Sequence, residues 1–237
     1  MLDLSIVIIN KNYINYLRKC LISCLNQNTK HLYEVIVVDD GSTDGSIDFV
    51  KNIKNKKIKF FQTNNKGIEI AANKGFRKSK AEYVVRVDSD DYLSKNFVNI
   101  MLNEANSSKA SFIYSNYYTT SLKKKLKVYL PDFNKKEIIQ RGDFLATGTV
   151  YHRKTIKKIG YYNEKTKNSG LENYELILKL IIKQNYGKRV KKCLFTYRKH
   201  KGNLSILKKE KIVNFGKKIF KKMKLGTYKK NKYHPWN

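Results

Sequence analysis

The chain has 237 residues and contains few of the residues that define several protein classes. Only three cysteines and two prolines occur, and 19 acidic residues are set against 50 lysines and arginines. An odd number of cysteines without framework spacing excludes a disulfide-stapled domain, and Asp3 lies where a secretory leader would carry positive charge. Apolar runs such as Ile6–Ile9 are far shorter than the ~20 residues of a membrane span. We therefore expect a cytoplasmic protein without an integral membrane helix.

Hydrophobic residues are 41% of the chain, enough for a packed domain, which argues against a disordered polyelectrolyte. The net charge of +31 is unevenly distributed. Residues 151–237 carry 26 basic and only four acidic side chains. Such a surplus indicates either an anionic partner or a lysine-rich surface that water solvates.

The C-terminal part concentrates this charge in one segment. Between Ile206 and Leu225, apolar residues recur at near-helical spacing among lysines: Leu207, Ile212, Val213, Phe215, Ile219, Phe220 and Met223. The pattern predicts a basic amphipathic helix that either packs on the domain or lies on an anionic membrane surface. A nucleic-acid partner is not expected, because the segment lacks the arginines and interleaved aromatic residues of a nucleic-acid groove.

The first half of the chain alternates short apolar segments with longer amphipathic ones. The predicted strands and the helices that follow them are, in order, 4–9 and 16–25, 34–38 and 45–53, 59–62 and 68–78, and 83–87 and 96–105. Four such repeats predict an α/β fold with a mostly parallel central sheet and helices on both faces. Ligands of such sheets bind at the carboxyl ends of the strands.

Polar side chains follow each of the four predicted strands, beginning with Asn10 and Asn12 after the first and Asp40 after the second. The fourth strand is followed by Asp88, Ser89, Asp90 and Asp91. Three carboxylates within four residues repel one another unless a cation compensates them, and carboxylate oxygens suit Mg²⁺ or Mn²⁺. A solvated acidic turn is the alternative. With a metal, the departing diphosphate of a nucleotide substrate would be neutralised.

Several of these blocks, in this order, resemble family 2 glycosyltransferases of the GT-A fold. They are the segments 5–10, 37–44, 65–68, 72–75 and 87–91, followed by 158–164, 170–176 and 197–205. The resemblance spans roughly residues 4–205. It implies transfer of a sugar from a nucleotide donor, usually a uridine diphosphate sugar, to a hydroxyl group of a glycan or lipid-linked acceptor, with inversion at the anomeric carbon.

The resemblance also implies roles for individual residues. Asn10, Asn12 and Asp40 match positions of the nucleoside pocket, and Lys66 and Asn73 match further donor-side positions. Asp88 matches the residue near the ribose and the waters of the metal ion, Ser89 lies in the same donor-binding segment, and Asp90 matches the direct metal ligand. His200 matches a further metal or phosphate contact, and Arg198 a diphosphate contact.

One position departs from the family pattern. Family members usually have Glu-Asp, with the aspartate as general base, where this chain has Glu172-Asn173. An amide cannot accept a proton from the acceptor, whereas Glu172 and Glu175, on one face of the predicted helix, could each substitute. We expect Glu172 to take the base role from the neighbouring position. An acceptor that arrives already ionised, or an inactive or altered enzyme, are the competing explanations.

The domain organisation predicted from these observations is a catalytic domain over 1–205 and a basic extension over 206–237. Within the domain, residues 1–115 would bind the nucleotide sugar and residues 116–205 the acceptor. The expected protein is a metal-dependent glycosyltransferase of surface polysaccharide or glycoconjugate synthesis, docked on the inner face of a membrane. The alternatives are a polyanion-binding protein that uses the C-terminal lysines, and a sugar nucleotidyltransferase. The sugar nucleotidyltransferase is not supported, because the first strand is not followed by a glycine-rich phosphate loop.

Overall fold

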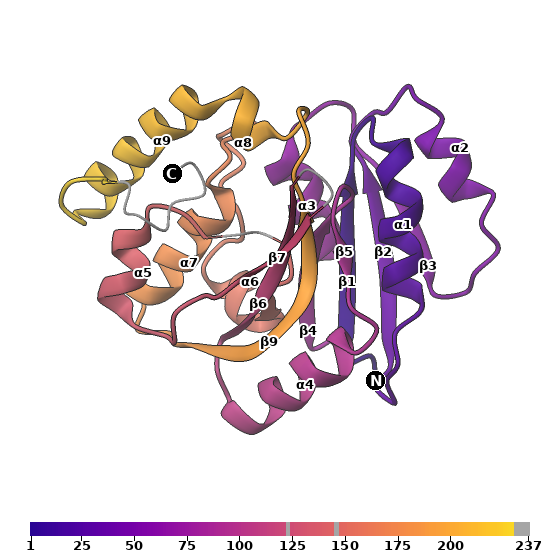
Figure 1. Cartoon of the computed structure of the whole chain (residues 1–237), viewed down its shortest axis with the longest axis horizontal. Coiled ribbons are helices and arrows are strands. Elements are labelled where there is room, and N and C mark those ends of the chain that lie inside the picture. The colour runs from indigo at the N-terminus through magenta and orange to yellow at the C-terminus, as the bar shows by residue number, and fades with distance from the viewer. Residues whose placement is uncertain (122–123, 145–146, 230–237) are drawn as a thin grey trace.

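The computed structural model describes residues 1–121, 124–144 and 147–229 (Figure 1). In the first half, strands β1 (Leu4–Asn10), β2 (Tyr33–Asp39), β3 (Ile58–Gln62) and β4 (Tyr83–Asp88) alternate with helices α1 (Ile14–Leu25), α2 (Ser46–Lys51) and α3 (Ile68–Lys78). The short strand β5 (Tyr92–Leu93) and helix α4 (Phe97–Ser108) follow. These bounds agree with the predicted segments to within three residues.

The second half adds strands β6 (Phe112–Ser121), β7 (Lys124–Val128), β8 (Val150–His152) and β9 (Gly187–Arg198). Its helices are α5 (Lys135–Arg141), α6 (Arg153–Lys158), α7 (Glu172–Ile182), α8 (Leu204–Leu207) and α9 (Lys209–Met223). The strands of both halves form one sheet in the order β3-β2-β1-β4-β8-β6-β9-β5, with β7 paired to β6. The predicted α/β class is therefore confirmed.

The parallel part of the sheet sets the position of the site. Strands β3, β2, β1 and β4 are all parallel, and the register places Asn10 opposite Asp39 and Ile9 opposite Asp88. The loops after these strands consequently emerge at the same edge. Beyond β4 the direction reverses, because β8 pairs with it antiparallel.

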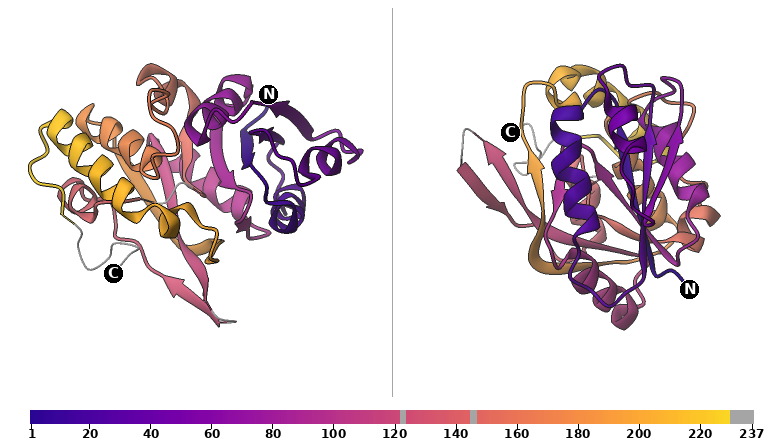
Figure 2. Two further views of the ribbon diagram at one scale, coloured as in Figure 1. Left: turned by 90° about the horizontal axis from the view of Figure 1, so that it is seen from above. Right: turned by 90° about the vertical axis from the view of Figure 1, so that its right-hand side faces the viewer.

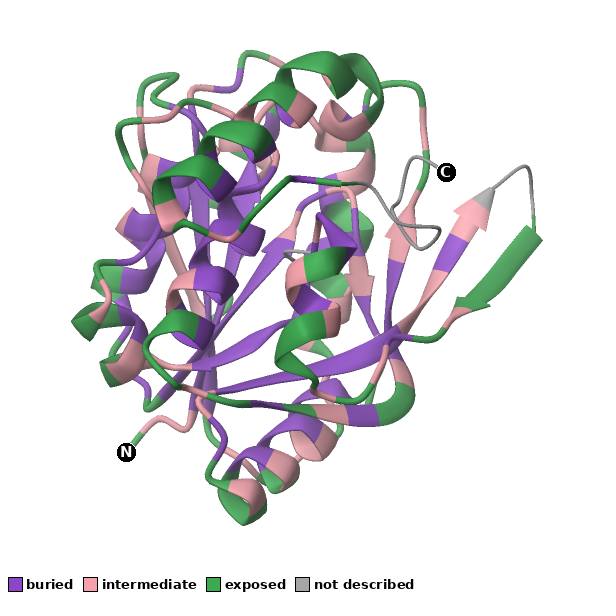
Figure 3. Ribbon diagram, turned by 90° about the vertical axis from the view of Figure 1, so that its left-hand side faces the viewer, coloured by how far each residue is buried: buried purple, intermediate pink, exposed green. Residues whose placement is uncertain are grey.

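Alternate residues of the strands face two separate apolar layers, as the two-residue period of a strand requires. In β1, Ile6 and Ile8 pack against α1 and α4, whereas Val7 and Ile9 belong to the layer of α3 and α7. Strands β1, β2 and β4 are buried along most of their length, which explains their mostly apolar sequences, whereas β3 at the edge of the sheet is only partly buried (Figure 3). Helices thus cover both faces, as predicted.

Helix α9 packs on this core and is part of the second layer. Ile212, Ile219 and Phe220 are buried, and the Phe220 ring stacks on Tyr174 of α7 at 6.4 Å between centroids. In Figure 1 the helix lies beside α5 and α7. Its lysines point outward. Of the two arrangements predicted for this amphipathic segment, the structure has the one in which the apolar face contacts the domain.

The predicted division at residue 205 remains a prediction, and residues 230–237 of the predicted extension lie outside the described residues. Within the described ranges, no helix is long and apolar enough to cross a membrane. The hairpin of β6 and β7 extends away from the rest of the chain in both views of Figure 2, and the side chains of β7 are mostly exposed.

Replacing Ile212 with alanine tests the packing of α9. The side chain is 1% exposed and fills the space above Gly170, so the substitution should lower the free energy of unfolding by about 2–5 kcal/mol. Urea denaturation followed by circular dichroism measures the change. Lys217→Ala, on the exposed side of the same helix, is the control and should stay within about 0.5 kcal/mol. Equal stabilities for the two variants would contradict the packing.

Candidate active site

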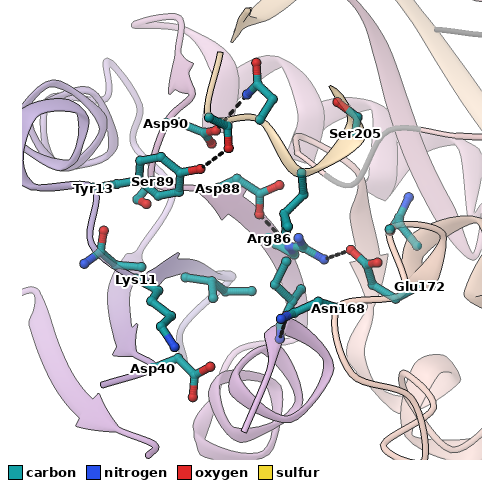
Figure 4. Close-up of a pocket in the computed structure, with 18 of the residues that line it drawn as sticks. Lys11, Tyr13, Asp40, Arg86, Asp88, Ser89, Asp90, Asn168, Glu172 and Ser205 are labelled. Atoms are coloured by element: carbon teal, nitrogen blue, oxygen red, sulfur yellow. Dashed lines mark hydrogen bonds and ion pairs between the residues drawn. The ribbon is translucent and has the colours of Figure 1, made fainter. Parts of the chain in front are cut away.

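A cavity of about 460 Å³ opens at the carboxyl ends of the parallel strands. On one side it is lined by residues that follow β1, β2 and β4, and on the other by the start of α7 and by loops before and after it in the chain (Figure 4). The residues predicted from sequence that line it are Asn10, Asn12, Asp40, Asp88, Ser89, Asp90, Glu172 and Asn173. The fold therefore brings eight predicted positions, separated by up to 163 residues, to one cavity.

Asp40 directly follows β2 and organises the loop that follows β3. Its Oδ1 accepts hydrogen bonds from Thr63 Oγ1 at 2.6 Å and from the Lys66 backbone N–H at 2.8 Å, and its Oδ2 accepts from Gly67 N–H at 2.8 Å. A carboxylate has about four acceptor positions, so three bonds leave one for a ligand. Gly67 has a φ of +99° and its neighbourhood is crowded, so a side chain there would disturb this loop.

The two asparagines after β1 are held by the loop after β2. Asn10 Nδ2 donates to Asp39 Oδ2 at 2.8 Å and to Ser42 Oγ at 3.1 Å. Its Oδ1 is buried and has no hydrogen-bond donor among the described residues, so a ligand N–H could satisfy it. Asn12 has a left-handed φ of 56° and accepts a hydrogen bond from Thr43 N–H at 2.8 Å. Ser42, which lies in the segment 37–44 singled out from sequence but was given no role of its own, binds both asparagines.

The segment after β4 presents two carboxylates to the cavity. Asp88 Oδ1 accepts from Arg86 Nε at 2.6 Å, and Asp90 Oδ2 accepts from His200 Nε2 at 3.0 Å and Asn203 Nδ2 at 3.1 Å. The second oxygen of each carboxylate has no partner within the described ranges. Burial raises the pKa of Asp88, and the neighbouring Arg86 opposes that rise.

These groups fit a divalent ion only if a ligand completes its coordination. Among the described residues no group of three or more His, Cys, Asp or Glu side chains is arranged to hold a metal ion. Asp88 and Asp90 offer two oxygens without hydrogen-bonding partners, and Mg²⁺ is usually held by one or two carboxylates together with substrate phosphates and water. The donor set therefore suits an ion that arrives with a diphosphate.

Arg198 and His200 hold the turn that carries Asp90, and neither residue is among those that line the cavity. The Arg198 guanidinium donates to the backbone carbonyls of Asp90, Ser89 and Tyr16. The His200 ring stacks on Tyr16 at 4.5 Å between centroids and reaches Asp90 with Nε2. Both residues fix the position of Asp90. Their predicted contacts with a diphosphate or a metal ion remain predictions.

Two predicted donor-side residues lie away from the cavity. Lys66 is exposed, and its described contact is the backbone bond to Asp40. Asn73 is completely buried in α3. Its amide nitrogen donates to Tyr162 O at 2.9 Å and to Glu164 Oε1 at 2.8 Å, while its oxygen accepts from Tyr162 N–H at 3.0 Å. Asn73 therefore joins α3 to the loop before α7, and neither side chain is brought to the site in this structure.

Arg86 is a site residue that sequence analysis missed. It lies within β4, has 2% of its side-chain area exposed, and lines the cavity. Nε pairs with Asp88 and Nη1 with Glu172 Oε1, both at 2.6 Å. A lone arginine between valines in an otherwise apolar buried strand was the available signal, because a charge in such a position requires partners.

The position opposite Arg86 is the start of α7. Glu172 lines the cavity, and Asn173 is fixed by neighbours: its Oδ1 accepts from the hydroxyls of Tyr151 at 2.6 Å and Tyr162 at 3.1 Å, and its Nδ2 donates to Phe144 O at 3.2 Å. An aspartate here would set a carboxylate oxygen against the Phe144 carbonyl. Asn173 is thus a packed structural amide at the place where the family pattern has its base.

Asp143, which sequence analysis also missed, lines the same side of the cavity. It follows α5, and no spacing in the sequence connects it with the residues it approaches in space. Desolvation raises the pKa of its carboxyl group to about 7, and the negative charge of Glu172 adds to the rise. Asp143 is therefore a carboxylate that can exchange a proton near neutral pH.

Replacing Arg86 with methionine tests the buried ion pairs. The variant keeps the side-chain volume but leaves Asp88 and Glu172 without their cation, so the free energy of unfolding at pH 7 should fall by about 3–5 kcal/mol. Without Arg86 the pKa of Asp88 rises further, and the folded state then binds a proton that the unfolded state releases. The loss should consequently shrink as the pH is lowered from 7 to 5. Guanidinium denaturation at both pH values measures it, and a loss that grows at pH 5 would contradict the assignment.

Comparisons with known proteins agree with this geometry. The model of the family described as Glycosyl transferase family 2 matches residues 5–167. An uncharacterized glycosyltransferase of Haemophilus influenzae is 31% identical over 169 residues, which are 68% of this chain and 67% of that protein. WfaP of Escherichia coli is 27% identical over 213 residues, which are 88% of this chain and 82% of the length of WfaP. That protein is named as a UDP-Glc:alpha-D-GlcNAc-diphosphoundecaprenol beta-1,3-glucosyltransferase. In contrast, the chain spans only 23% of the glycosyltransferase GlyA of Streptococcus pneumoniae.

Solved structures show the same fold. TarS 1–349 of S. aureus in complex with UDP superposes with a TM-score of 0.74 at 20% identity, over 95% of this chain and 66% of that chain. The complex of the same protein with UDP-GlcNAc superposes with a TM-score of 0.73 at 18% identity, over 93% of this chain and 73% of that chain. With a family model that covers more than two thirds of its length and a sheet that superposes on such enzymes, the chain belongs to glycosyltransferase family 2 and has the GT-A fold.

Proposed function

We propose that the protein transfers a sugar from a uridine diphosphate donor to a hydroxyl group of a glycan or lipid-linked acceptor, with inversion and with Mn²⁺ or Mg²⁺. The observation that carries the proposal is the placement of Asp88 and Asp90 in one cavity with Asn10 and Asp40. This cavity can hold a diphosphate at one end and a nucleobase at the other. The relatives' names, which mention UDP-glucose and UDP-GlcNAc, support a uridine nucleotide.

The nucleoside end has the acceptors that uracil requires. Uracil has one N–H group free for recognition, at N3, flanked by two carbonyl oxygens. The unpaired Oδ1 of Asn10 and the remaining acceptor position of Asp40 are suited to an N–H donor. A buried acceptor that lacks a partner costs about 1–3 kcal/mol, so a ligand that satisfies it gains affinity and specificity.

At the diphosphate end, Asp88 and Asp90 would hold the metal ion, and the ion when bound would neutralise the charge of the departing diphosphate. His200 and Asn203 keep Asp90 in place by hydrogen bonds to its Oδ2, which leaves Oδ1 for coordination. Arg86 keeps Asp88 turned toward the cavity in the same way. This division of labour explains why each carboxylate uses only one of its oxygens within the protein.

On the acceptor side, apolar residues lie beside the entrance of the cavity. Leu204 and Leu207 of α8 line the cavity, and Leu207 and Ile206 are 66% and 55% exposed. A purely hydrophilic glycan would not require exposed leucine and isoleucine beside the entrance, whereas the prenyl chain of a lipid-linked acceptor would. The acceptor named for WfaP is a diphosphoundecaprenol-linked sugar. We therefore favour a lipid-linked acceptor in polysaccharide or glycoconjugate synthesis.

Exchanging Asp90 for asparagine tests the metal and donor site together. Calorimetric titration of UDP in the presence of Mn²⁺ should show binding by the unmodified protein and at least tenfold weaker binding by Asp90→Asn, about 1.4 kcal/mol. Asp132→Asn, the same chemical change at a side chain that is 71% exposed and paired with Arg189, should bind as the unmodified protein does. Equal affinity of the Asp90 variant, or binding indifferent to Mn²⁺, would rule out the proposed role of Asp90.

We also propose that the exposed lysines of α9 bind the enzyme to the anionic inner face of a membrane. The apolar side of α9 is used by the domain, so the attraction must be electrostatic rather than by insertion of this helix. Each lysine near such a surface contributes about 1 kcal/mol, and the outward face carries Lys209, Lys211, Lys217, Lys218, Lys221 and Lys222. A polyanion or nucleic acid that uses the same lysines is the alternative.

Binding to lipid vesicles tests this surface. The protein should sediment with phosphatidylglycerol vesicles but not with phosphatidylcholine vesicles, and exchange of Lys217, Lys218, Lys221 and Lys222 for glutamine should weaken the binding at least tenfold at low salt. Substitution is preferable to truncation, because removing α9 would expose the core. The charge-matched control exchanges four exposed lysines elsewhere: Lys30, Lys54, Lys56 and Lys80. Equal losses in both variants, or preference for duplex DNA over vesicles, would contradict a specific membrane surface.

A further inference from the structure

The reaction needs a group that accepts a proton, and the chain lacks the usual one. As the acceptor oxygen bonds to the anomeric carbon of the donor, its hydroxyl proton must leave. Asn173 cannot take it, and its amide is held by Tyr151, Tyr162 and Phe144. The acids that line the acceptor side of the cavity in the described part of the chain are Glu172 and Asp143.

Glu172 is poorly suited to accept this proton. Its Oε1 is 2.6 Å from Nη1 of Arg86, an ion pair in which both side chains are almost fully buried. Its Oε2 accepts from Ser169 Oγ at 3.4 Å. Both carboxylate oxygens of Glu172 therefore already have partners, and proton transfer to Oε1 would require the charge-assisted pair with Arg86 to separate. Glu172 therefore serves to hold Arg86 beside Asp88.

Asp143 has the opposite environment. Its described hydrogen bond is the one that Oδ1 accepts from Phe144 N–H at 2.6 Å, and within the described ranges it forms no ion pair. Its Oδ2 is left for a ligand hydroxyl. The loop that carries it is anchored by the Tyr228 hydroxyl, which donates a hydrogen bond to Gly142 O at 2.6 Å, and the preceding helix α5 by the Tyr174 hydroxyl, which donates to Ile139 O at 2.6 Å. The carboxylate is thus held at the wall of the cavity by contacts that leave its proton-accepting oxygen unused.

The surroundings of Asp143 bring its protonation into the neutral range. Burial raises its pKa to about 7, the negative charge of Glu172 adds to that, and the Phe144 N–H and Arg141 oppose it. The other titratable groups whose charges act on it or that respond to its charge are Tyr117, Tyr174, Tyr197 and Tyr228. A base whose pKa lies near the working pH combines sufficient basicity with a sufficient ionised fraction.

We propose that Asp143 is the general base of this enzyme, an inference that rests on the proposed transfer from a uridine diphosphate sugar. The acceptor oxygen forms its bond to the anomeric carbon, the bond from that carbon to the diphosphate oxygen breaks, and the electron pair leaves with UDP. The acceptor proton passes to the Asp143 carboxylate and from there to water. Glu172 and Arg86 are positioning residues in this assignment.

The test uses an anionic nucleophile that carries no proton. With Mn²⁺ and UDP-glucose or UDP-GlcNAc, the unmodified protein should release UDP slowly by transfer to water. Asp143→Asn should lower that rate by about 10²–10⁴-fold. Sodium azide should restore UDP release by this variant, with a glycosyl azide of inverted configuration as product, because azide attacks without losing a proton. The unmodified protein should gain little from azide.

The pH profile gives a second measurement. In the unmodified protein the rate of transfer to water should increase from pH 6 to pH 8 with a midpoint near 7, because the ionised carboxylate is the active form. Azide-driven release by Asp143→Asn should lack that dependence. Glu172→Gln is the comparison variant, and azide should not restore its rate. Asp132→Asn, an exposed position that is not among the residues lining the cavity, should behave as the unmodified protein does.

Affinity for UDP separates this proposal from the one on which it rests. Asp143→Asn should bind UDP with Mn²⁺ within twofold of the unmodified protein, since the side chain lies on the acceptor side. A full transfer rate in Asp143→Asn, or azide rescue confined to Glu172→Gln, would overturn the assignment to Asp143 and leave the glycosyltransferase proposal intact. Absence of UDP binding and of turnover in the unmodified protein would overturn both.

Discussion

A buried guanidinium in the middle of β4 connects the two sides of the cavity. Arg86 bonds to Asp88 at the end of its own strand and to Glu172 at the start of α7, two residues that are 84 positions apart in the chain. A charge with 2% of its area exposed is stable only when it is paired, so the strand end and the helix start must stay together. The acidic end of β4 and the start of α7 are thereby held at a fixed distance from each other.

The remaining site geometry follows from the parallel sheet. Because β1, β2, β3 and β4 run in the same direction, the loops after them meet at one edge, and each loop stabilises the next. Asp40 binds the backbone after β3, and Ser42 binds the asparagines after β1. Hydrogen bonds between loops orient these side chains before any ligand arrives, which lowers the ordering cost of binding.

The basic C-terminal helix shows how one amphipathic sequence can serve two environments. Its apolar side is part of the core around α7, and its lysines remain in water. A helix that is anchored in this way presents charge at a fixed place on the enzyme. Together with the apolar residues of α8 beside the cavity entrance, it would set the open end of the site toward an anionic surface.

The sequence by itself determined the alternation of strands and helices, the edge of the sheet at which the cavity opens, and most of the predicted residues that line it. These features depend on local periodicity and on the residues that directly follow each strand, and both are visible in the order of amino acids. Asp40, Asp88 and Asp90 were identifiable for that reason. The blocks that resemble the family added the start of α7, although not the function of its side chains.

Only the tertiary structure decided which carboxylates are paired within the protein and which are left for a ligand. Asp143 has no neighbour in sequence that suggests catalysis, and its raised pKa arises from burial beside residues that are distant in the chain. Lys66 and Asn73 follow the sequence pattern, yet one is exposed and the other is used in packing. Desolvation and pairing are properties of three-dimensional surroundings, so protonation and orientation could not be read before the chain was folded.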